Sequence, residues 1–455
     1  MKNLKWKKVG SAVLATALAG SMVLPATAYA QGEIVQLEGG TSTQTNTAPE
    51  QVFLNKYSGT VRTQNFNDNW KFYLGDASGA QTPAFDDSSW DQVNLPHDYS
   101  IDQKYNRSMD GESGYLPGGT GWYRKSFTVD KSLEGKRISI DFGGVYMNAT
   151  IYVNGKKLGT HPYGYTPFSF DITDNVKFGK ENVIAVKVDH QTPSSRFYSG
   201  SGIYRDVDFV VTDTVHVDKN GTKIETPDLK EHVDGNNVAV KVKTTVVNES
   251  ERDASVKVKH TIYPKNGTAE QAVATFESQE AVAVEKGKSK DVSADFTASG
   301  VQLWSTTTPN LYTVKTEVLM DGATVDTYET DYGFRYFAFD KNNGFTLNGQ
   351  KMKLQGVCMH HDQGALGSVA NDRSTERQVE ILKMMGCNSI RVTHNPASDE
   401  LIDACNKHGI LVIDEAFDGW VAPKNGNSND YAKWFNKEIE SDNEIMGAAD
   451  NMTWA

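Results

Sequence analysis

The sequence predicts a multi-domain protein that is mostly β-sheet and ends in an α/β segment. At 455 residues the chain is too long for one hydrophobic core. Residues 58–337 contain short runs of alternating apolar and polar residues, separated by turn residues, as β-strands do. From about residue 338 apolar residues recur at helical spacing between short apolar runs, which is typical of a parallel β/α series. We therefore expect two β-sandwiches followed by β/α units.

The first thirty residues have the pattern of an export signal. Lysines at positions 2, 5, 7 and 8 precede a small, apolar stretch, and Ala28-Tyr29-Ala30 forms an A-x-A cleavage pattern. The apolar run is shorter than the roughly 20 residues that a membrane helix needs. We therefore predict a signal peptide at residues 1–30, a secreted or cell-surface location, and no membrane span after cleavage.

Composition narrows the choice of partners. Residues 31–57 are rich in Gln, Thr, Gly and Ala and have few large apolar residues, which predicts a linker. The chain has 46 basic and 58 acidic residues and a net charge of −12. It lacks the basic surface that binds phosphates, so we expect no nucleic-acid partner. The three cysteines all lie in the final segment, and their odd number argues against a disulfide framework. We expect them to be small buried residues.

Residues 58–216 are predicted to form the first β-sandwich. Alternating runs occupy residues 122–129, 137–142, 150–153 and 183–188, and Asn154-Gly155 is a two-residue hairpin signal. Three loops combine glycine with aromatic or charged residues, at 95–99, 114–122 and 196–205. Residues of this kind either take part in binding or catalysis or only form the turns, and the pattern alone leaves both interpretations open.

Residues 217–337 are predicted to form a second, immunoglobulin-like sandwich. Alternating runs at 238–247, 255–263 and 311–319 are joined by polar loops, and Asp321-Gly322 is a hairpin signal. These loops contain no cluster of candidate catalytic or binding residues, so we interpret this module as a spacer.

Residues 354–357, 388–392 and 410–413 are predicted to be the strands of the α/β segment. Thr375 with Gln378 has the capping-box spacing of a helix start. Ser398 is expected to cap the next helix and Gly409 to end it.

Polar residues follow each of these three strands. The carboxyl ends of parallel strands meet at the edge of the sheet where ligands bind. The spacing does not match a zinc site, which leaves a structural polar network or a pocket for sugar hydroxyls. We favour the sugar pocket. The clustered residues are His360, His361, Asp362, Arg391, His394, Asn395, Asp414 and Glu415, followed by Asp418 and Trp420.

The same residues do not supply a pair of catalytic carboxylates. A retaining glycosidase needs two carboxyl groups about 5–5.5 Å apart. Asp414 and Glu415 are adjacent in a predicted strand, so their side chains should point to opposite faces. Asp362 or Asp418 could partner one of them, but both lie in predicted loops.

Several motifs together resemble glycoside hydrolase family 2, and within it the secreted bacterial β-galactosidases. Residues 388–396 with 409–415 resemble the family's first signature, and residues 356–362 its strand-end motif with a substrate-contacting histidine. Residues 95–98 and 201–207 resemble motifs of its sugar-binding jelly-roll domain. The resemblance implies a jelly roll at 58–216, an immunoglobulin-like sandwich at 217–337, and the start of a (β/α)8 TIM barrel at 338–455. About three β/α units are present, where a closed barrel has eight.

The resemblance implies an enzyme that hydrolyses terminal β-D-galactosides by a retaining two-glutamate mechanism. β-Glucuronidase and β-mannosidase are the alternatives within the family. Both catalytic glutamates are expected beyond Ala455, so we expect this chain to be a truncated, inactive piece. A non-catalytic carbohydrate-binding or adhesive protein is the alternative from another class.

The strand-end pattern and the resemblance together give the expected binding properties. We expect a β-galactoside oligosaccharide or glycan as partner and no required cofactor, with Mg²⁺ or Na⁺ possible in the full-length enzyme and its ligands unassigned. The expected substrate-binding residues are Asp98, Arg196, His360, His361, Arg391, His394, Asp414, Glu415 and Trp420.

Overall fold

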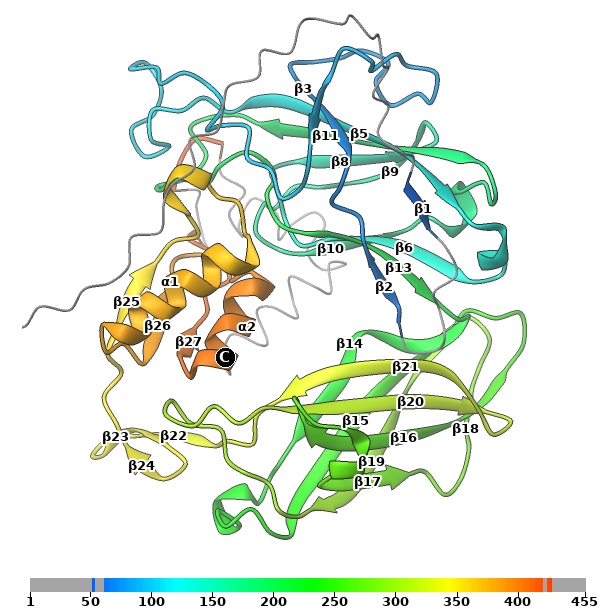
Figure 1. Ribbon diagram of the computed structural model, residues 1–455, viewed down its shortest axis with the longest axis vertical. Coiled ribbons are helices and arrows are strands. Elements are labelled where there is room, and N and C mark those ends of the chain that lie inside the picture. The colour runs from blue at the N-terminus through cyan, green and yellow to red at the C-terminus, as the bar shows by residue number, and fades with distance from the viewer. Residues whose placement is uncertain (1–50, 54–60, 420–423, 428–455) are drawn as a thin grey trace, which may run out of the picture. The chain divides into compact units, whose positions relative to one another are not determined.

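The computed structural model describes residues 51–53, 61–419 and 424–427 (Figure 1). The predicted signal peptide, most of the predicted linker and Trp420 lie outside the described residues. The described residues all belong to one compact unit. No helix in the described part of the chain has the length and apolarity needed to cross a membrane.

The first module is a β-sandwich, as predicted. Its larger sheet contains, in spatial order, β4 (Asp91–Val93), β3 (Trp70–Leu74), β5 (Gly119–Val129), β11 (Glu181–His190), β8 (Ala149–Val153) and β9 (Lys156–His161), and β1 (Gln51–Phe53) pairs with β5. Its smaller sheet contains β10 (Phe168–Asp171), β6 (Arg137–Phe142), β13 (Val207–Thr212) and β2 (Thr63–Asn65). A short separate pair joins β7 (Val145–Tyr146) to β12 (Gly202–Ile203).

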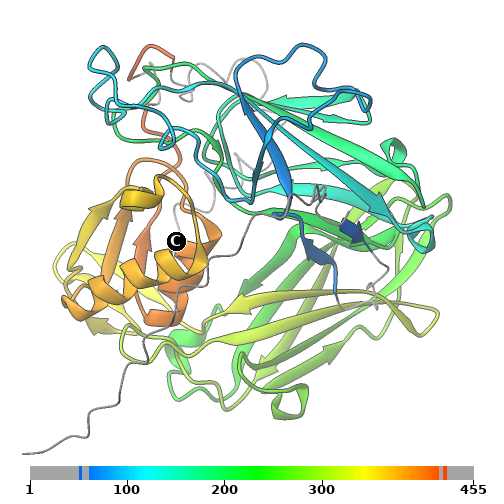
Figure 2. The same cartoon turned by 45° about the horizontal axis from the view of Figure 1, so that its top comes forward.

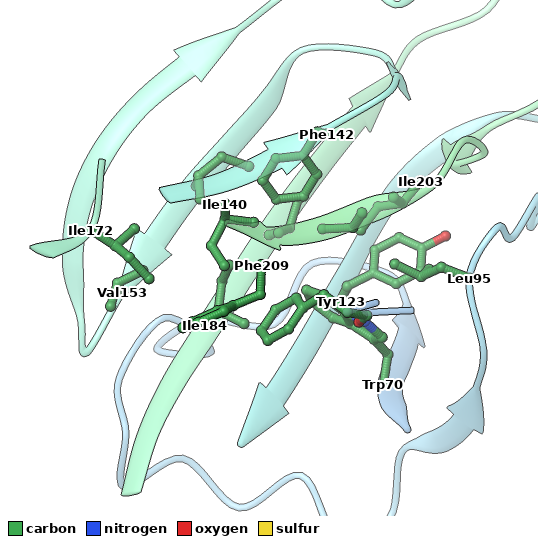
Figure 3. Packing of buried hydrophobic residues seen from close by; sticks show 14 of the residues in the cluster. Trp70, Leu95, Tyr123, Ile140, Phe142, Val153, Ile172, Ile184, Ile203 and Phe209 are labelled. Atoms are coloured by element: carbon green, nitrogen blue, oxygen red, sulfur yellow. The ribbon is translucent and has the colours of Figure 1, made fainter. Parts of the chain in front are cut away.

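The core of this module follows from the alternation of apolar residues along its strands. On β6 the buried residues are Ile138, Ile140 and Phe142, one on every second position. Figure 3 shows Ile140 and Phe142 packed with Phe209 of β13 among the buried apolar side chains of the cluster. Burying one large apolar side chain contributes roughly 1.5–3 kcal/mol. The predicted Asn154-Gly155 hairpin is confirmed, because both residues have positive φ, 50° and 83°.

Two predicted boundaries of the first module need correction. The segment predicted as linker includes β1, which pairs in parallel with β5. The module boundary predicted after residue 216 falls inside β14 (Val215–Glu225), whose partner is β15 (Val238–Asn248) of the second module. The first module therefore ends before Val215.

The second module is also a two-sheet sandwich. One sheet contains β14, β15 and β19 (Lys288–Ala298). The other contains β17 (Ala274–Glu277), β16 (Ala254–Pro264), β20 (Tyr312–Met320) and β21 (Ala323–Tyr332), with β18 (Val282–Val284) paired to β16. Asp321 and Gly322 join β20 to β21 with φ of 51° and 80°, which confirms the predicted hairpin.

The final segment begins with a small antiparallel sheet that the sequence patterns did not predict. Its strands are β22 (Phe337–Asp340), β23 (Gly344–Leu347) and β24 (Gln350–Lys351). Leu347 packs in one buried cluster with Trp304 of the second module and Leu411 of the last strand. The predicted boundary at residue 338 lies inside β22.

The predicted β/α series follows. Its elements are β25 (Gly356–Met359), α1 (Asp372–Met384), β26 (Ser389–Val392), α2 (Asp399–His408) and β27 (Leu411–Ile413). The three strands are parallel, in the order β25-β26-β27. Figure 2 shows α1 and α2 side by side over this short sheet. Their buried residues, among them Val379 and Leu401, pack against Ile390 and Val412 of the strands.

The helix caps confirm one prediction and correct another. Ser398 caps α2 through its side chain and Gly409 ends it in the left-handed conformation, as predicted. The start of α1 was predicted at Thr375, but Asn371 is its N-cap and its side chain accepts from the backbone N–H of Ser374. An Asn caps a helix as well as a Thr does, and the earlier cap gives the helix one more turn.

The cysteine prediction holds only in part. Cys405 is buried on α2, Cys387 is half-buried, and Cys358 is exposed on β25, so burial was wrong for Cys358. In register with it across the sheet are Arg391 and Ile413, which are also exposed.

Five short 3₁₀ helices lie in loops of the described residues. They are η1 (Lys131–Leu133), η2 (Thr173–Asn175), η3 (Leu229–Glu231), η4 (Ala269–Gln271) and η5 (Gly364–Leu366).

Candidate functional site

The ends of β26 and β27 and one loop of the first module border an open cavity of about 380 Å³. We call it the strand-end cavity. The loop, residues 194–201, follows β11, and we call it the Phe197 loop. The cavity is lined by Arg196, Arg391, His394, Glu415, Ala416, Phe417 and Asp418. Four of the predicted substrate-binding residues therefore line one cavity, together with Asp418 of the predicted cluster and with Ala416 and Phe417, for which no role was predicted.

Glu415 connects two predicted residues at the floor of this cavity. Its Oε1 accepts a hydrogen bond from Nε of Arg391 at 2.6 Å, and its Oε2 lies 2.7 Å from Nδ1 of His394. All three side chains keep some exposure, 46% for Arg391, 25% for His394 and 21% for Glu415. The group therefore offers fixed donors and acceptors to a ligand in the cavity.

Arg196 reaches the same cavity from the first module. Its Nε donates to Oδ2 of Asp418 at 2.8 Å, and its Nη2 pairs with Oδ1 of the same carboxylate. Such a bidentate pair fixes the plane of the guanidinium group. The loop at 196–205, in which the sequence combines glycine with aromatic and charged residues, thus supplies part of the cavity wall.

The two neighbouring histidines have different surroundings. The ring of His360 is stacked on Phe197, with ring centroids 4.3 Å apart, and lies 5.9 Å from the ring of His394. His361 turns toward the first module, where its Nε2 lies 3.1 Å from the carbonyl oxygen of Ser199. Burial lowers the pKa of His361 to about 4, so its imidazole is neutral at pH 7. The structure thus places His360, and not His361, beside His394.

Asp414 supports the site from below and does not line the cavity. Its Oδ1 accepts from the backbone N–H groups of Ala397 and Glu415 at 2.9 and 3.1 Å. Burial raises the pKa of this carboxyl group. Asp414 and Glu415 follow β27 and do not lie within it, contrary to the prediction, yet their carboxylates have different partners.

Asp98 was predicted to contact the sugar, but its carboxylate is buried within the protein. Its exposed fraction is 1%, and both carboxylate oxygens accept hydrogen bonds from protein donors. A hydroxyl group of a ligand cannot reach a carboxylate that is covered in this way. We therefore correct its predicted role from ligand contact to support of the surrounding loops.

Two residues near the cavity were missed as functional candidates. One is Phe197, which stacks on His360, whereas Asp418, which pairs with Arg196, is one of the polar residues that the strand-end pattern already contained. The buried guanidinium of Arg205 donates to the carbonyl oxygen of Pro396 at 2.9 Å and so ties the first module to the loop after β26. The sequence marked residues 196–205 as unusual, but it gave no means to tell which of them meet the barrel segment.

A larger cavity, of about 870 Å³, is lined by the second module and both helices. It contains neither the strand-end groups nor a stacked aromatic surface, so we do not place the site there.

Among the described residues one group of side chains could converge on a metal ion: Glu376, Glu380 and His408. Arg373 and Lys407 already pair with these carboxylates, so the group does not fit a bound cation.

Comparison with known proteins identifies the modules. The sugar-binding domain of glycosyl hydrolases family 2 matches residues 63–213, the family 2 domain matches 222–335, and the family 2 TIM barrel domain matches 340–453. A β-galactosidase of Bacteroides ovatus is 43% identical over 380 residues, which cover 83% of this chain and 43% of the relative. A putative β-glucuronidase of Formosa agariphila is 35% identical and covers 83% of this chain and 35% of the relative.

A solved structure supports the same assignment. The crystal structure of a glycosyl hydrolase family 2 member from Bacteroides cellulosilyticus has a TM-score of 0.79 and 39% identity, covering 86% of this chain and 50% of that one. The chain thus spans half or less of the length of these relatives. With all three domain types matched in order, the chain belongs to glycosyl hydrolase family 2, whose members act on carbohydrates.

Proposed function

We propose that this chain supplies the glycone-binding part of a retaining β-galactosidase. The observation that carries the proposal is the strand-end cavity, in which paired polar groups from the barrel strands meet Arg196 of the sugar-binding module. The 43% identity to a β-galactosidase supports galactose as the sugar. Sugar hydroxyls need both donors and acceptors, and this cavity has guanidinium, imidazole and carboxylate groups.

The charges in the cavity favour a neutral sugar over a uronic acid. Arg196 and Arg391, both in the cavity wall, are each held by a carboxylate, Asp418 and Glu415 respectively. Binding a glucuronide would bring a further carboxylate to guanidinium groups that already have one. We therefore prefer β-galactoside to β-glucuronide, and β-mannoside stays an alternative because it is also neutral.

We further propose that the acid/base and nucleophile carboxylates of the mechanism are not among the described residues. Of the described residues that line the strand-end cavity, the two acids are Glu415 and Asp418, and each is paired with an arginine. A general acid must present its carboxyl group to the leaving group, and both of these carboxylates already have hydrogen-bonded partners in the protein.

Two assays of the purified chain test these proposals together. Saturable binding of D-galactose without hydrolysis of an aryl β-galactoside is the expected result. Hydrolysis at the rate of a full-length relative would contradict the proposed absence of the catalytic pair. Hydrolysis or tighter binding of the matched β-glucuronide or β-mannoside would contradict the choice of sugar.

A carbohydrate-binding protein without catalytic activity is the second candidate, because the sugar-binding domain alone covers residues 63–213. Isolated from the rest, this module would bind galactose under that alternative. Under our proposal it would not, because His394, Arg391 and Glu415 are then missing from the cavity.

We also propose that the protein is exported by a bacterium after cleavage behind Ala30. Mass spectrometry of protein secreted by a bacterial host should find Gln31 as the new N-terminus, and retention of Met1 would contradict it.

A role for Mg²⁺ or Na⁺ stays a prediction, which galactose titrations with and without chelator or sodium will test.

A further inference from the structure

Asp98 lies at a junction of three segments that are distant in sequence. Its Oδ1 accepts from the backbone N–H groups of Ser100 and Ser201 at 2.9 and 2.8 Å. Its Oδ2 accepts from the hydroxyl of Tyr198 at 2.6 Å and from the backbone N–H and Oγ of Ser368 at 2.9 and 3.2 Å. One buried carboxylate thus holds its own loop, the Phe197 loop and the loop between β25 and α1.

The backbone around this carboxylate leaves no room for another side chain. Gly200 has a φ of 66°, and a Cβ on it would lie 1.9 Å from Oγ of Ser368 and 2.6 Å from Oδ2 of Asp98. A Cβ on Gly367, whose φ is 67°, would lie 2.2 Å from the same Oδ2. The junction is therefore closely packed, and a side chain at either glycine would displace Asp98 or its neighbours.

The Phe197 loop reaches the strand-end cavity in two ways: Arg196 lines it, and Phe197 lies beside it, with its ring centroid 6.2 Å from that of the lining residue His394. Phe197 stacks on the imidazole of His360 with an interplanar angle of 28°, and Arg196 pairs with Asp418. Both residues lie within three positions of Tyr198 and Ser199, and Tyr198 is bound directly to Asp98. A shift of the loop would therefore move Arg196 in the cavity wall and, through Phe197, the His360 ring that lies 5.9 Å from the ring of His394.

We propose that Asp98 is a positioning residue for the sugar cavity, which fixes the Phe197 loop so that Phe197 orients His360. The proposal rests on the proposed function for its effect on sugar binding. Its structural part, the coupling of Asp98 to the His360 ring, is independent of what the cavity binds.

The test observes His360 directly. The full chain is labelled with ¹³C-histidine, and the ring resonance of His360 is assigned by its loss in His360→Gln. Protons of an imidazole stacked on a benzene ring are shielded, so Phe197→Leu should move this resonance downfield, whereas Phe197→Tyr should leave it near the wild-type position. Asp98→Asn should move it in the direction of Phe197→Leu, because an amide can no longer accept from all these donors.

Matched control variants distinguish a specific effect of Asp98 on His360 from a general disturbance of the loop. Asp102→Asn changes an acid of the same loop, 69% exposed and paired with His97, and should leave the His360 resonance unchanged. In a galactose titration, Asp98→Asn should weaken binding by about tenfold and Asp102→Asn should not.

A folded Asp98→Asn chain with the wild-type His360 resonance would overturn the proposal. Should that variant fail to fold, Tyr198→Phe and Ser368→Ala each remove one hydroxyl donor, and an unchanged resonance in both would overturn it. A chain that shows the expected resonance shifts but no galactose binding would support the positioning role and contradict the proposed function instead.

Discussion

Arg196 and Asp418 form a bidentate ion pair, with Nε of the arginine 2.8 Å from Oδ2 of the aspartate, although 222 positions separate them in the sequence. The arginine belongs to the sugar-binding sandwich, and the aspartate follows the third barrel strand. The wall of the strand-end cavity is therefore shared by the two modules. Sugar binding should depend on their contact and not on either module alone.

Breaking this pair should weaken galactose binding. Arg196 is 41% exposed, so water screens the pair and its direct contribution is modest, about 0.5–1 kcal/mol. We expect Arg196→Gln and Asp418→Asn each to weaken binding several-fold, and the double variant to be little worse than either single one. Isothermal titration of the four proteins measures this cycle.

A matched control lies in the second module. Lys286 and Glu251 form a surface pair far from the cavity in sequence, and Glu251 is 92% exposed. Glu251→Gln should leave galactose binding unchanged. Full additivity of the Arg196 and Asp418 effects would contradict the proposed coupling.

Replacing Glu415 should have a larger effect than breaking the Arg196 pair. Its carboxylate binds Arg391 and His394 at once, so Glu415→Gln leaves at least one of them without its acceptor. We expect galactose binding to fall by roughly tenfold, as for loss of a charged hydrogen bond. Glu380→Gln, on the exposed side of α1, is the control. Equal binding by both variants would show that the strand-end group is not part of the sugar site.

Alanine substitutions at two glycines with nearly the same φ distinguish the cost of backbone strain from the cost of a steric collision. Gly200 and Gly287 have φ of 66° and 67°, but a Cβ would collide only at Gly200. Gly287→Ala should cost about 1 kcal/mol from its positive φ. Gly200→Ala adds the collision with Ser368 and should cost about 3 kcal/mol or more. Thermal unfolding of both variants tests this, and equal melting temperatures would contradict the tight junction at Asp98.

The buried His260 should make stability depend on pH. It is fully buried in the second module between Phe276 and Phe296, and its Nε2 has no hydrogen-bond partner. Burial lowers its pKa from 6.5 to about 4. The unfolded chain therefore takes up a proton near pH 6.5 that the folded chain takes up only near pH 4, so stability falls as the pH drops through this window.

His260→Phe removes this proton uptake. Relative to the wild type, the variant should gain about 2 kcal/mol of stability when the pH is lowered from 7.5 to 5. Denaturant unfolding at the two pH values measures it. The same stability difference at both pH values would contradict the neutral, buried state of His260.

Local signals in the sequence were sufficient for most of the fold. Period-two alternation located the long strands, and the dipeptides Asn154-Gly155 and Asp321-Gly322 located two hairpins, because short-range sterics decide these features. Ser398 and Gly409 bounded α2 for the same reason. The cap of α1 was misplaced because Asn371 and Thr375 are both good caps, and only the packing of the helix selects between them.

The site was less predictable, since its geometry depends on contacts between distant segments. The strand-end pattern found Arg391, His394 and Glu415, which one sheet brings together. It could not show that Asp98 is covered by Ser368, which lies 270 positions away. Likewise β1 is only three residues long, too short to show an alternating pattern, and it was missed because pairing with β5 determines its conformation.

The decisive measurement is an equilibrium titration of the full chain with D-galactose and, separately, D-glucuronate. We expect saturable galactose binding, on the order of millimolar, that Glu415→Gln weakens, together with weaker binding of glucuronate. Absence of saturable galactose binding, or a preference for glucuronate, would contradict the claim that this chain holds the glycone site of a β-galactosidase.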